Sequence, residues 1–223
     1  MHIHILGICG TFMGGVASLA KASGYRVTGC DTNVYPPMST QLQSVGIELI
    51  EGFDKKQTEL KPDLYVIGNV VSRGNPLMEE IMNRGLPYIS GPQWLYEAIL
   101  KDKWVLAVAG THGKTTTSSM LAWILEFNGY APGFLIGGVP LNFNVSARLP
   151  QKNDSNETSP FFVIEADEYD TAFFINALNL FITIRRLRYL IILNMITQTF
   201  FQIFTRLKRN FIIWYAWCPV LDA

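Results

Sequence analysis

The sequence predicts an α/β fold made of two nucleotide-binding domains in series. Three observations support this expectation: apolar runs alternate with helical patterns, a glycine-rich turn follows the first run, and a second glycine turn follows a long apolar run near the middle of the chain. Alternating strand and helix patterns are typical of parallel sheets covered by helices. The 223 residues leave room for one large or two modest domains.

The first domain, expected over residues 1–99, begins with a short apolar strand at His2–Leu6. A glycine-rich turn follows, then a helix that runs to about Ala22, and a second strand at Tyr25–Gly29 that leads to Asp31. This order is typical of a Rossmann-like nucleotide site. The spacing G-x-x-G-x-x-x-G argues against an ordinary NAD site but preserves a diphosphate loop; the alternative is a tight turn without a ligand. Asp31 either bonds a ribose hydroxyl or caps the next element.

The same rhythm continues to the end of this domain. We expect a strand at Asp63–Ile67, a helix at Leu77–Arg84 opened by Pro76, a strand at Pro87–Ser90 and a helix at Pro92–Leu100. Loops at the carboxyl ends of such strands hold ligands in open α/β sheets. Ser72 and Arg73, in the loop after the Asp63–Ile67 strand, are therefore candidate phosphate contacts, or else ordinary surface residues. The polar segment Lys101–Lys103 marks the expected domain boundary.

The second domain, expected from residue 100, opens with the buried strand Trp104–Gly110. Gly110-Thr-His-Gly-Lys-Thr115 follows, and a helix is expected from Thr116 to Asn128. This is a phosphate-binding loop between a strand and a helix N-terminus, where backbone N–H groups close around phosphate oxygens. Lys114 would reach the β- and γ-phosphates, and the Thr115 hydroxyl would bind Mg²⁺. Val108 stands where the usual G-x-x-x-x-G-K-[ST] motif has its first glycine.

A strand that ends in acidic residues follows further along the chain. We expect a strand and turn at residues 133–138, a polar surface loop at 150–159, and a strand from Phe161 that ends in four acids: Glu165, Asp167, Glu168 and Asp170. Carboxylates at the end of a parallel strand beside a phosphate loop suit a Mg²⁺ site. The alternative is a solvated acidic turn. Glu165, the first acid after the strand, is the preferred ligand.

The composition excludes several classes of protein. Lys and Arg together number 18, as do Asp and Glu, so the charge balance points to neither nucleic acid nor an anionic membrane. The N-terminal residues lack the basic region of a signal peptide. Cys9, Cys30 and Cys218 have no metal-binding spacing, and we interpret them as free thiols in a reducing cytoplasm.

Four segments together resemble the Mur ligase family: GICGTFMGG (7–15), GTHGKTTT (110–117), GGVPLNF (137–143) and EADEYDTAFF (165–174). The resemblance covers residues 1–174. It implies an ATP-dependent ligase of peptidoglycan recycling that joins UDP-N-acetylmuramate to the tripeptide L-alanyl-γ-D-glutamyl-meso-diaminopimelate through an acyl-phosphate. The alternatives are the ligase that adds L-alanine to the same UDP-sugar and a fragment that binds the UDP-sugar without catalysis.

The resemblance also implies roles for particular residues. Lys114 would be the catalytic residue, and the ATP phosphates would be held by Gly110, Thr111, His112, Gly113, Lys114, Thr115 and Thr116. The metal ligands would be Thr115 and Glu165. The UDP-sugar would be bound by Gly7, Cys9, Gly10, Thr11, Gly14, Asp31, Ser72 and Arg73. His112 is interpreted as a conformational or packing residue rather than a base.

The character of the chain changes after Phe174. Residues 175–223 contain one acid, Asp222, and basic residues interrupt the apolar runs, so the segment suits neither a membrane anchor nor the rest of an ATPase domain. The tail can also be read in a shifted frame, in which the third base of each codon is joined to the first two bases of the next codon. In this frame, codons for residues 208–219 can encode T-Q-F-H-H-L-V-R-M-V-P, and codons for residues 189–203 can encode L-N-N-F-E-Y-D-H-A-D-I-F-P-D. Both strings resemble the family's continuation. We infer that one base was lost after the codon for Phe174. We therefore expect residues 100–174 to form only the first part of the ATPase domain and residues 175–223 to lack a native fold. The chain as written is expected to be truncated and inactive.

Overall fold

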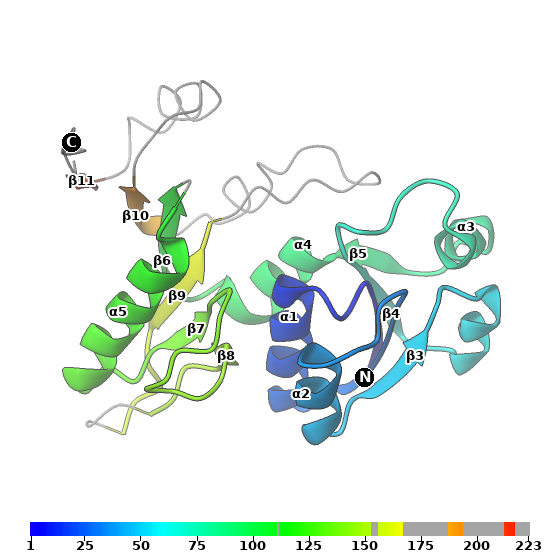
Figure 1. The fold of residues 1–223 in the computed structure, drawn as a ribbon, viewed down its shortest axis with the longest axis horizontal. Helices are drawn as coiled ribbons and strands as arrows, with labels where there is room; N and C mark the ends of the chain where they lie inside the picture. Colours follow the sequence, from blue (N-terminus) through cyan, green and yellow to red (C-terminus); the bar gives the residue numbers. More distant parts are fainter. Residues whose placement is uncertain (111, 153–155, 167–186, 194–211, 217–223) are drawn as a thin grey trace. The chain divides into compact units, whose positions relative to one another are not determined.

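The computed structural model describes residues 1–110, 112–152, 156–166, 187–193 and 212–216 (Figure 1). The chain divides into two compact units. Unit 1 is built mainly from residues 1–99, and unit 2 mainly from residues 100–146, 150–166 and the two strands that follow. Each unit has its own sheet and its own apolar core.

Unit 1 contains a five-stranded sheet in the order β3-β2-β1-β4-β5, whose neighbouring strands all pair in parallel. The strands are β1 (His2–Leu6), β2 (Arg26–Asp31), β3 (Glu48–Glu51), β4 (Leu64–Ile67) and β5 (Tyr88–Ser90). The helices are α1 (Thr11–Ala22), α2 (Met38–Ser44), the 3₁₀ helix η1 (Lys55–Leu60), α3 (Pro76–Asn83), α4 (Gly91–Leu95) and the π-helical turn η2 (Tyr96–Leu100). The order of the strands reverses between β1 and β4, which is where ligands bind in doubly wound sheets.

The core of unit 1 explains why these segments fold as they do. Leu6, Cys30 and Ile67 stand side by side on three neighbouring strands, and Tyr65 lies two residues before Ile67. These residues pack against one apolar stripe of α3, formed by Leu77, Met78 and Ile81. The alternation follows from the two-residue period of a strand and the stripe from the period of a helix. The helix α1 contacts β2, α2 and α4. The predicted elements of this unit are therefore present, with α2, β3 and η1 in addition.

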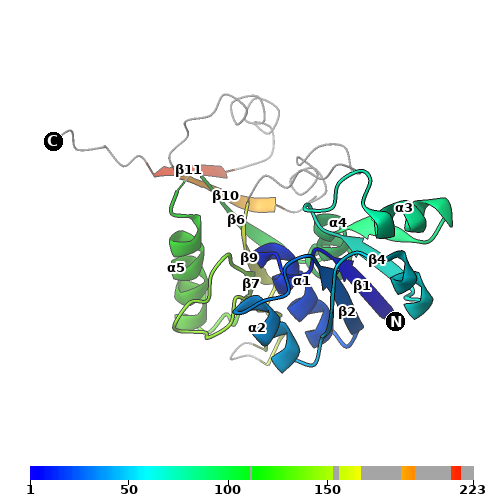
Figure 2. The same ribbon diagram turned by 45° about the vertical axis from the view of Figure 1, so that its right-hand side comes forward.

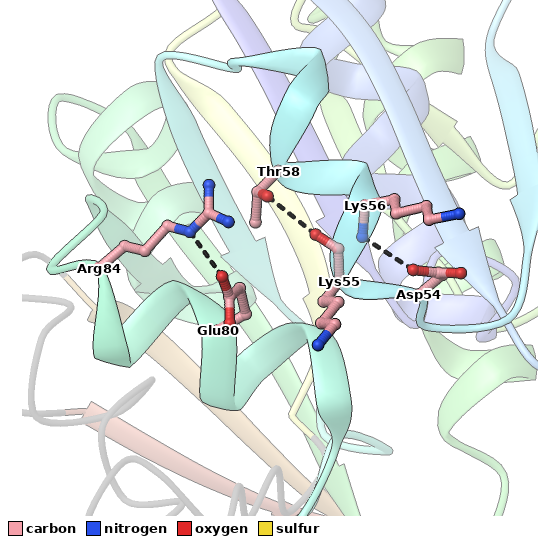
Figure 3. A network of polar contacts seen from close by, with 6 residues as sticks. All are labelled: Asp54, Lys55, Lys56, Thr58, Glu80 and Arg84. Atoms are coloured by element: carbon pink, nitrogen blue, oxygen red, sulfur yellow. Dashed lines mark hydrogen bonds and ion pairs between the residues drawn. The ribbon is translucent and has the colours of Figure 1, made fainter.

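Local hydrogen bonds fix the outer surface of η1 and α3 (Figure 3). The Asp54 carboxylate caps η1 by accepting from the Lys56 N–H at 2.8 Å, and the Thr58 hydroxyl donates to the Lys55 carbonyl at 2.8 Å. On α3, Arg84 Nε donates to Glu80 Oε1 at 2.6 Å, one helical turn away. These contacts stabilise helix ends and have no link to the carboxyl edge of the sheet.

Unit 2 contains a six-stranded sheet in the order β11-β10-β6-β9-β7-β8. The strands are β6 (Trp104–Gly110), β7 (Gly133–Leu135), β8 (Ala147–Arg148), β9 (Phe161–Glu165), β10 (Leu187–Leu193) and β11 (Ile212–Ala216). The helix α5 (Lys114–Phe127) contacts β6 and β9 and lies along one face of the sheet in Figures 1 and 2. Its buried Ala122 packs against Leu106, Phe134, Ile136 and Val163.

Two strands lie within the segment for which we expected no native fold. β10 pairs in parallel with β6, and β11 pairs in parallel with β10. Their sequences, LRYLIIL and IIWYA, are rich in β-branched and aromatic residues, and such runs suit a parallel strand whatever reading frame encodes them. The rest of residues 175–223 lies outside the described part. Among the described helices, none has the length and apolar character needed to cross a bilayer.

Candidate functional site

The turn after β1 is held tightly against the loop after β4. Gly7 has a φ of +77° and donates its N–H to the Cys30 carbonyl at 2.8 Å. A Cβ at Gly7 would lie 2.5 Å from Val70 Cγ2, and one at Gly68 would lie 2.7 Å from the Leu6 carbonyl oxygen. Both glycines are needed because the two loops approach each other where β1 and β4 end. The same edge carries the N-terminus of α1, whose N-cap residue, Gly10, provides no side-chain cap.

Asp31 braces this turn. The buried carboxylate accepts from the Cys9 N–H at 2.9 Å and from the Asn33 N–H at 3.2 Å. It therefore joins the end of β2 to the turn between β1 and α1. In the structure the carboxylate accepts from backbone groups on both sides of it in the fold, one of which belongs to the candidate diphosphate loop itself, and the ribose contact stays a prediction.

The other UDP-sugar candidates lie along the same edge. Gly14 packs α1 against α2, since a Cβ there would lie 2.5 Å from Met38 Sδ. Thr11 is the first residue of α1. Ser72 and Arg73 are exposed in the loop after β4, next to β1 in the sheet. The backbone carbonyl of Ser72 accepts from the Asn75 N–H at 3.2 Å, which shapes the loop without fixing either side chain.

Burial disfavours the thiolate form of the two described cysteines. Burial raises the pKa of Cys9 to about 11, and the nearby Asp31 carboxylate acts in the same direction. Burial raises the pKa of Cys30 still further above its ordinary range. Both thiols stay protonated at neutral pH, so their place at the turn is one of packing.

The phosphate loop of unit 2 has a strand before it and a helix after it. Gly113 has a φ of +78° and is the N-cap residue of α5. This left-handed residue turns the chain into the helix two residues earlier than we predicted, so Lys114 and Thr115 belong to the first turn of α5. Lys114 Nζ donates to the Gly110 carbonyl at 2.7 Å, which folds the ammonium group back over the loop. His112 is exposed, and Thr111 lies outside the described residues.

Glu165 ends β9, next to this loop in the sheet. In the parallel register it stands opposite Val108, and the Ala166 N–H donates to the Val108 carbonyl at 2.8 Å. Glu165 is buried, with 6% of the residue exposed, and its Oε1 accepts from the Gly137 N–H at 2.8 Å. Of the four predicted acids, Glu165 alone lies in the described part; Asp167, Glu168 and Asp170 fall outside it.

Two glycines that had no predicted role, Gly137 and Gly138, lie against the two candidate metal ligands. A Cβ at Gly137 would lie 3.1 Å and 3.3 Å from the two Glu165 carboxylate oxygens, and one at Gly138 would lie 3.1 Å from Thr115 Cγ2. The bend after β7 therefore contacts both side chains. A glycine pair that begins two residues after a short strand was the signal available in the sequence, and it is weak alone because glycine pairs are common in turns.

The donor set fits Mg²⁺ held together with a nucleotide. The described residues include no group of three or more His, Cys, Asp or Glu side chains that could enclose a metal by themselves. They do supply a carboxylate and a hydroxyl at a phosphate loop, both hard oxygen donors. Mg²⁺ is commonly bound by one or two protein oxygens, with phosphates and water completing its shell.

Comparisons with known proteins identify the family of the chain. The profile described as "Mur ligase family, catalytic domain" matches residues 2–103, and the profile described as "Mur ligase middle domain" matches residues 108–215. The chain belongs to the Mur ligase family. The two profiles together span both units and reach into the segment after Phe174.

Relatives of this Mur ligase chain carry informative names. It is 63% identical over 174 residues to UDP-N-acetylmuramate--L-alanyl-gamma-D-glutamyl-meso-2,6-diaminoheptandioate ligase of Escherichia coli, a match that covers 78% of this chain and 36% of the relative. It is 36% identical over 171 residues to a UDP-N-acetylmuramate--L-alanine ligase of Psychrobacter, covering 77% and 34%. The chain thus spans about a third of the length of these curated relatives.

One solved structure is similar to this chain over nearly its whole length. It is the UDP-N-acetylmuramate:L-alanyl-gamma-D-glutamyl-meso-diaminopimelate ligase from Neisseria meningitides, with a TM-score of 0.84 and 48% identity. The match covers 99% of this chain and 82% of that one. The α/β architecture predicted from the sequence is confirmed by this likeness and by the two parallel sheets.

Proposed function

We propose that this chain carries the UDP-sugar-binding unit and the first part of the ATP-binding unit of a peptidoglycan-recycling ligase. The reaction joins UDP-N-acetylmuramate to L-alanyl-γ-D-glutamyl-meso-diaminopimelate in the cytoplasm. The observation that carries the proposal is the Gly110–Thr116 loop at the N-terminus of α5, with Glu165 on the adjacent strand. The identity of 63% to the E. coli relative supports this substrate pair.

In unit 2, we assign to the phosphate loop the binding and orientation of the ATP phosphates. Backbone N–H groups of Gly110–Thr116 face the phosphates, and the Lys114 ammonium exchanges the Gly110 carbonyl for phosphate oxygens. Thr115 and Glu165 are the protein ligands that we assign to Mg²⁺, which when bound would neutralise the phosphate charge. Lys114 stabilises the negative charge on the transferring phosphoryl group, which is why we assign it the catalytic role.

The covalent steps need few side chains. A muramate carboxylate oxygen attacks the γ-phosphorus and ADP leaves; the peptide amine then attacks the acyl carbon, loses a proton, and inorganic phosphate leaves. Positioning the reactants and neutralising charge supply most of the rate in such a reaction. His112 is not required as a base in this proposal, in keeping with its exposed place in the loop.

In unit 1, we assign the UDP diphosphate to the turn between β1 and α1. Gly7, Cys9, Gly10 and Thr11 form the turn that leads into the N-terminus of α1, which favours anions. The Gly7 and Cys9 N–H groups are bonded to the Cys30 carbonyl and the Asp31 carboxylate and shape this turn, so we assign the diphosphate to the first N–H groups of α1, beginning with that of Thr11. Gly14 lets this helix approach α2, and Asp31 holds the turn in place. Ser72 and Arg73 reach the same ligand from the loop after β4.

The segment after Phe174 limits what the chain does as written. We propose that one base is missing between the codons for Phe174 and Ile175, so that the family's N-N-F-E-Y-D-H segment is not translated in frame. The E. coli match extends over 174 residues, the same number that precede this point. The chain as written then binds its ligands without catalysing the ligation. Sequencing the genomic DNA across codons 170–180 tests this directly, and an intact frame would refute it.

Two rival functions are separated by one set of experiments. For the frame-restored protein, phosphate release with UDP-N-acetylmuramate and ATP should depend on the tripeptide; dependence on L-alanine instead would identify the L-alanine ligase. For the chain as written, calorimetry should show UDP-N-acetylmuramate binding without phosphate release, as expected of a binding fragment. Binding of NAD in place of the UDP-sugar would contradict the assignment of unit 1.

A further inference from the structure

The bend at Gly137 and Gly138 follows β7 and runs beside the end of β9. β7 pairs in parallel with β9, with Leu135 opposite Ile164, and the Ile136 N–H donates to the Ser146 carbonyl at 2.8 Å. These bonds hold the next two residues next to Glu165. The bend is therefore built on the sheet rather than on a free loop.

Neither glycine is explained by backbone conformation. Many glycines of the chain have positive φ values, but Gly137 and Gly138 do not. Room for neighbouring side chains explains both: a Cβ at Gly137 would crowd the Glu165 carboxylate, and one at Gly138 would crowd Thr115. The chain thus keeps glycine at two positions whose neighbours are the two metal candidates.

The Gly137 N–H also solves an electrostatic problem. A carboxylate on a buried residue such as Glu165 loses hydration, which is costly unless a donor compensates. The 2.8 Å bond to the Gly137 N–H supplies this compensation at Oε1 and fixes the orientation of the group. Within the described residues Glu165 Oε2 has no recorded donor, and we assign it as the ligand atom.

We propose that Gly137 and Gly138 are positioning residues that fix Glu165 and Thr115 as a pair for a divalent cation bound with a nucleotide. This inference rests on the proposed function, in which those two side chains bind Mg²⁺. Gly137 acts through Glu165 and Gly138 through Thr115, and neither touches the reacting atoms. Partners of metal ligands commonly change metal affinity by about 10- to 100-fold when altered.

The test is Mn²⁺ binding to the full chain in the presence of ATP, followed by electron paramagnetic resonance. Gly137→Ala keeps the N–H but crowds the carboxylate, and we expect Mn²⁺ affinity to fall by about tenfold. Val139→Ala trims an exposed side chain two residues along the same bend and is the matched control, with unchanged affinity expected. A second variant, Glu165→Asp, keeps the charge but draws the carboxylate back from Gly137, and should weaken Mn²⁺ binding similarly.

A double-mutant cycle separates positioning from general structure. If Gly137 acts through Glu165, then Gly137→Ala should have no further effect on Mn²⁺ affinity in the Glu165→Ala chain. Equal affinity in Gly137→Ala and the unsubstituted chain, or additive losses in the cycle, would overturn the inference while leaving the proposed function standing. If the unsubstituted chain shows no ATP-dependent Mn²⁺ binding at all, the metal assignment in the proposed function fails as well.

Discussion

Lowering the pH from 7 to 5 tests the buried histidine of unit 1. His4 Nε2 donates to Gln57 Oε1 at 3.0 Å, because the Gln57 amide nitrogen is committed to the Gly52 carbonyl at 2.9 Å. His4 Nδ1 then accepts from the Thr28 hydroxyl at 2.8 Å. This arrangement satisfies a neutral ring, and a second proton at Nδ1 would require the Thr28 hydroxyl to turn from donor to acceptor. Burial accordingly lowers the pKa of His4 to about 4, against a smaller opposing effect of the Gln57 hydrogen bond.

The direction and size of the effect follow from linkage. Below its ordinary pKa of 6.5 the unfolded chain binds a proton that the folded chain rejects until the pH reaches about 4. Stability is therefore fully present above pH 6.5, falls with pH through this window, and changes no further below it. At about 1.36 kcal/mol per pKa unit, the whole window corresponds to about 3 kcal/mol, of which about 2 kcal/mol is lost between pH 7 and pH 5.

Two measurements check this. The chain has three histidines, so an NMR titration of their ring protons, with a His4→Asn variant for assignment, gives the pKa of His4 in the folded protein. Urea unfolding followed by the backbone amide signals of β1 gives the stability of unit 1 at each pH. The stability of the His4→Asn variant should depend less on pH by about 2 kcal/mol between pH 7 and pH 5. A His4 ring that titrates near 6.5 in the folded chain would refute the reasoning.

The remaining predictions concern the phosphate loop, a surface ion pair and an exposed helix face. Lys114→Ala in the frame-restored protein should abolish measurable ligation in a phosphate-release assay, and undiminished ligation would refute the site assignment. Arg84→Ala should cost at most about 0.5 kcal/mol in urea unfolding, because the pair with Glu80 is a half-exposed i,i+4 contact. Phe127, 80% exposed, lies in an apolar stripe of α5 with Met120, Trp123 and Ile124. We expect this stripe to cause self-association, measurable by sedimentation, and Phe127→Ser to reduce it without loss of helix.

The sequence predicted the elements whose signals are local. A short apolar run indicates β1, and glycine spacing indicates the turn that begins at Gly7. Pro76 indicates the start of α3. α2 escaped prediction because its seven residues have no capping side chain, no acid in the first turn and no base in the last. The start of α5 was placed too late, since the left-handed Gly113 begins the helix immediately after the loop.

The site was predictable only as far as chemistry follows from residue type. Lys114 and Glu165 could be selected because an ammonium and a carboxylate near a phosphate loop have obvious uses. Asp31 could not be assigned from the sequence, because the choice between a ligand contact and the Cys9 N–H depends on where the β1 turn lies in space. Gly137 was missed for the same reason: its contact with Glu165 spans 28 positions in the chain.

The segment after Phe174 shows how differently a sheet and an active site depend on sequence. A parallel strand at the edge of β6 needs backbone N–H and C=O groups and a run of β-prone residues, and β10 meets both conditions. β10 also overlaps the stretch whose alternative frame permits L-N-N-F, so a strand there is compatible with either reading. A ligand site has no such tolerance, because it needs particular carboxylate and imidazole groups at particular positions. A shifted frame can therefore preserve the pairing of a sheet while removing the residues that a ligase reaction requires. A family match that extends through β10 and into β11 carries no assurance of catalysis.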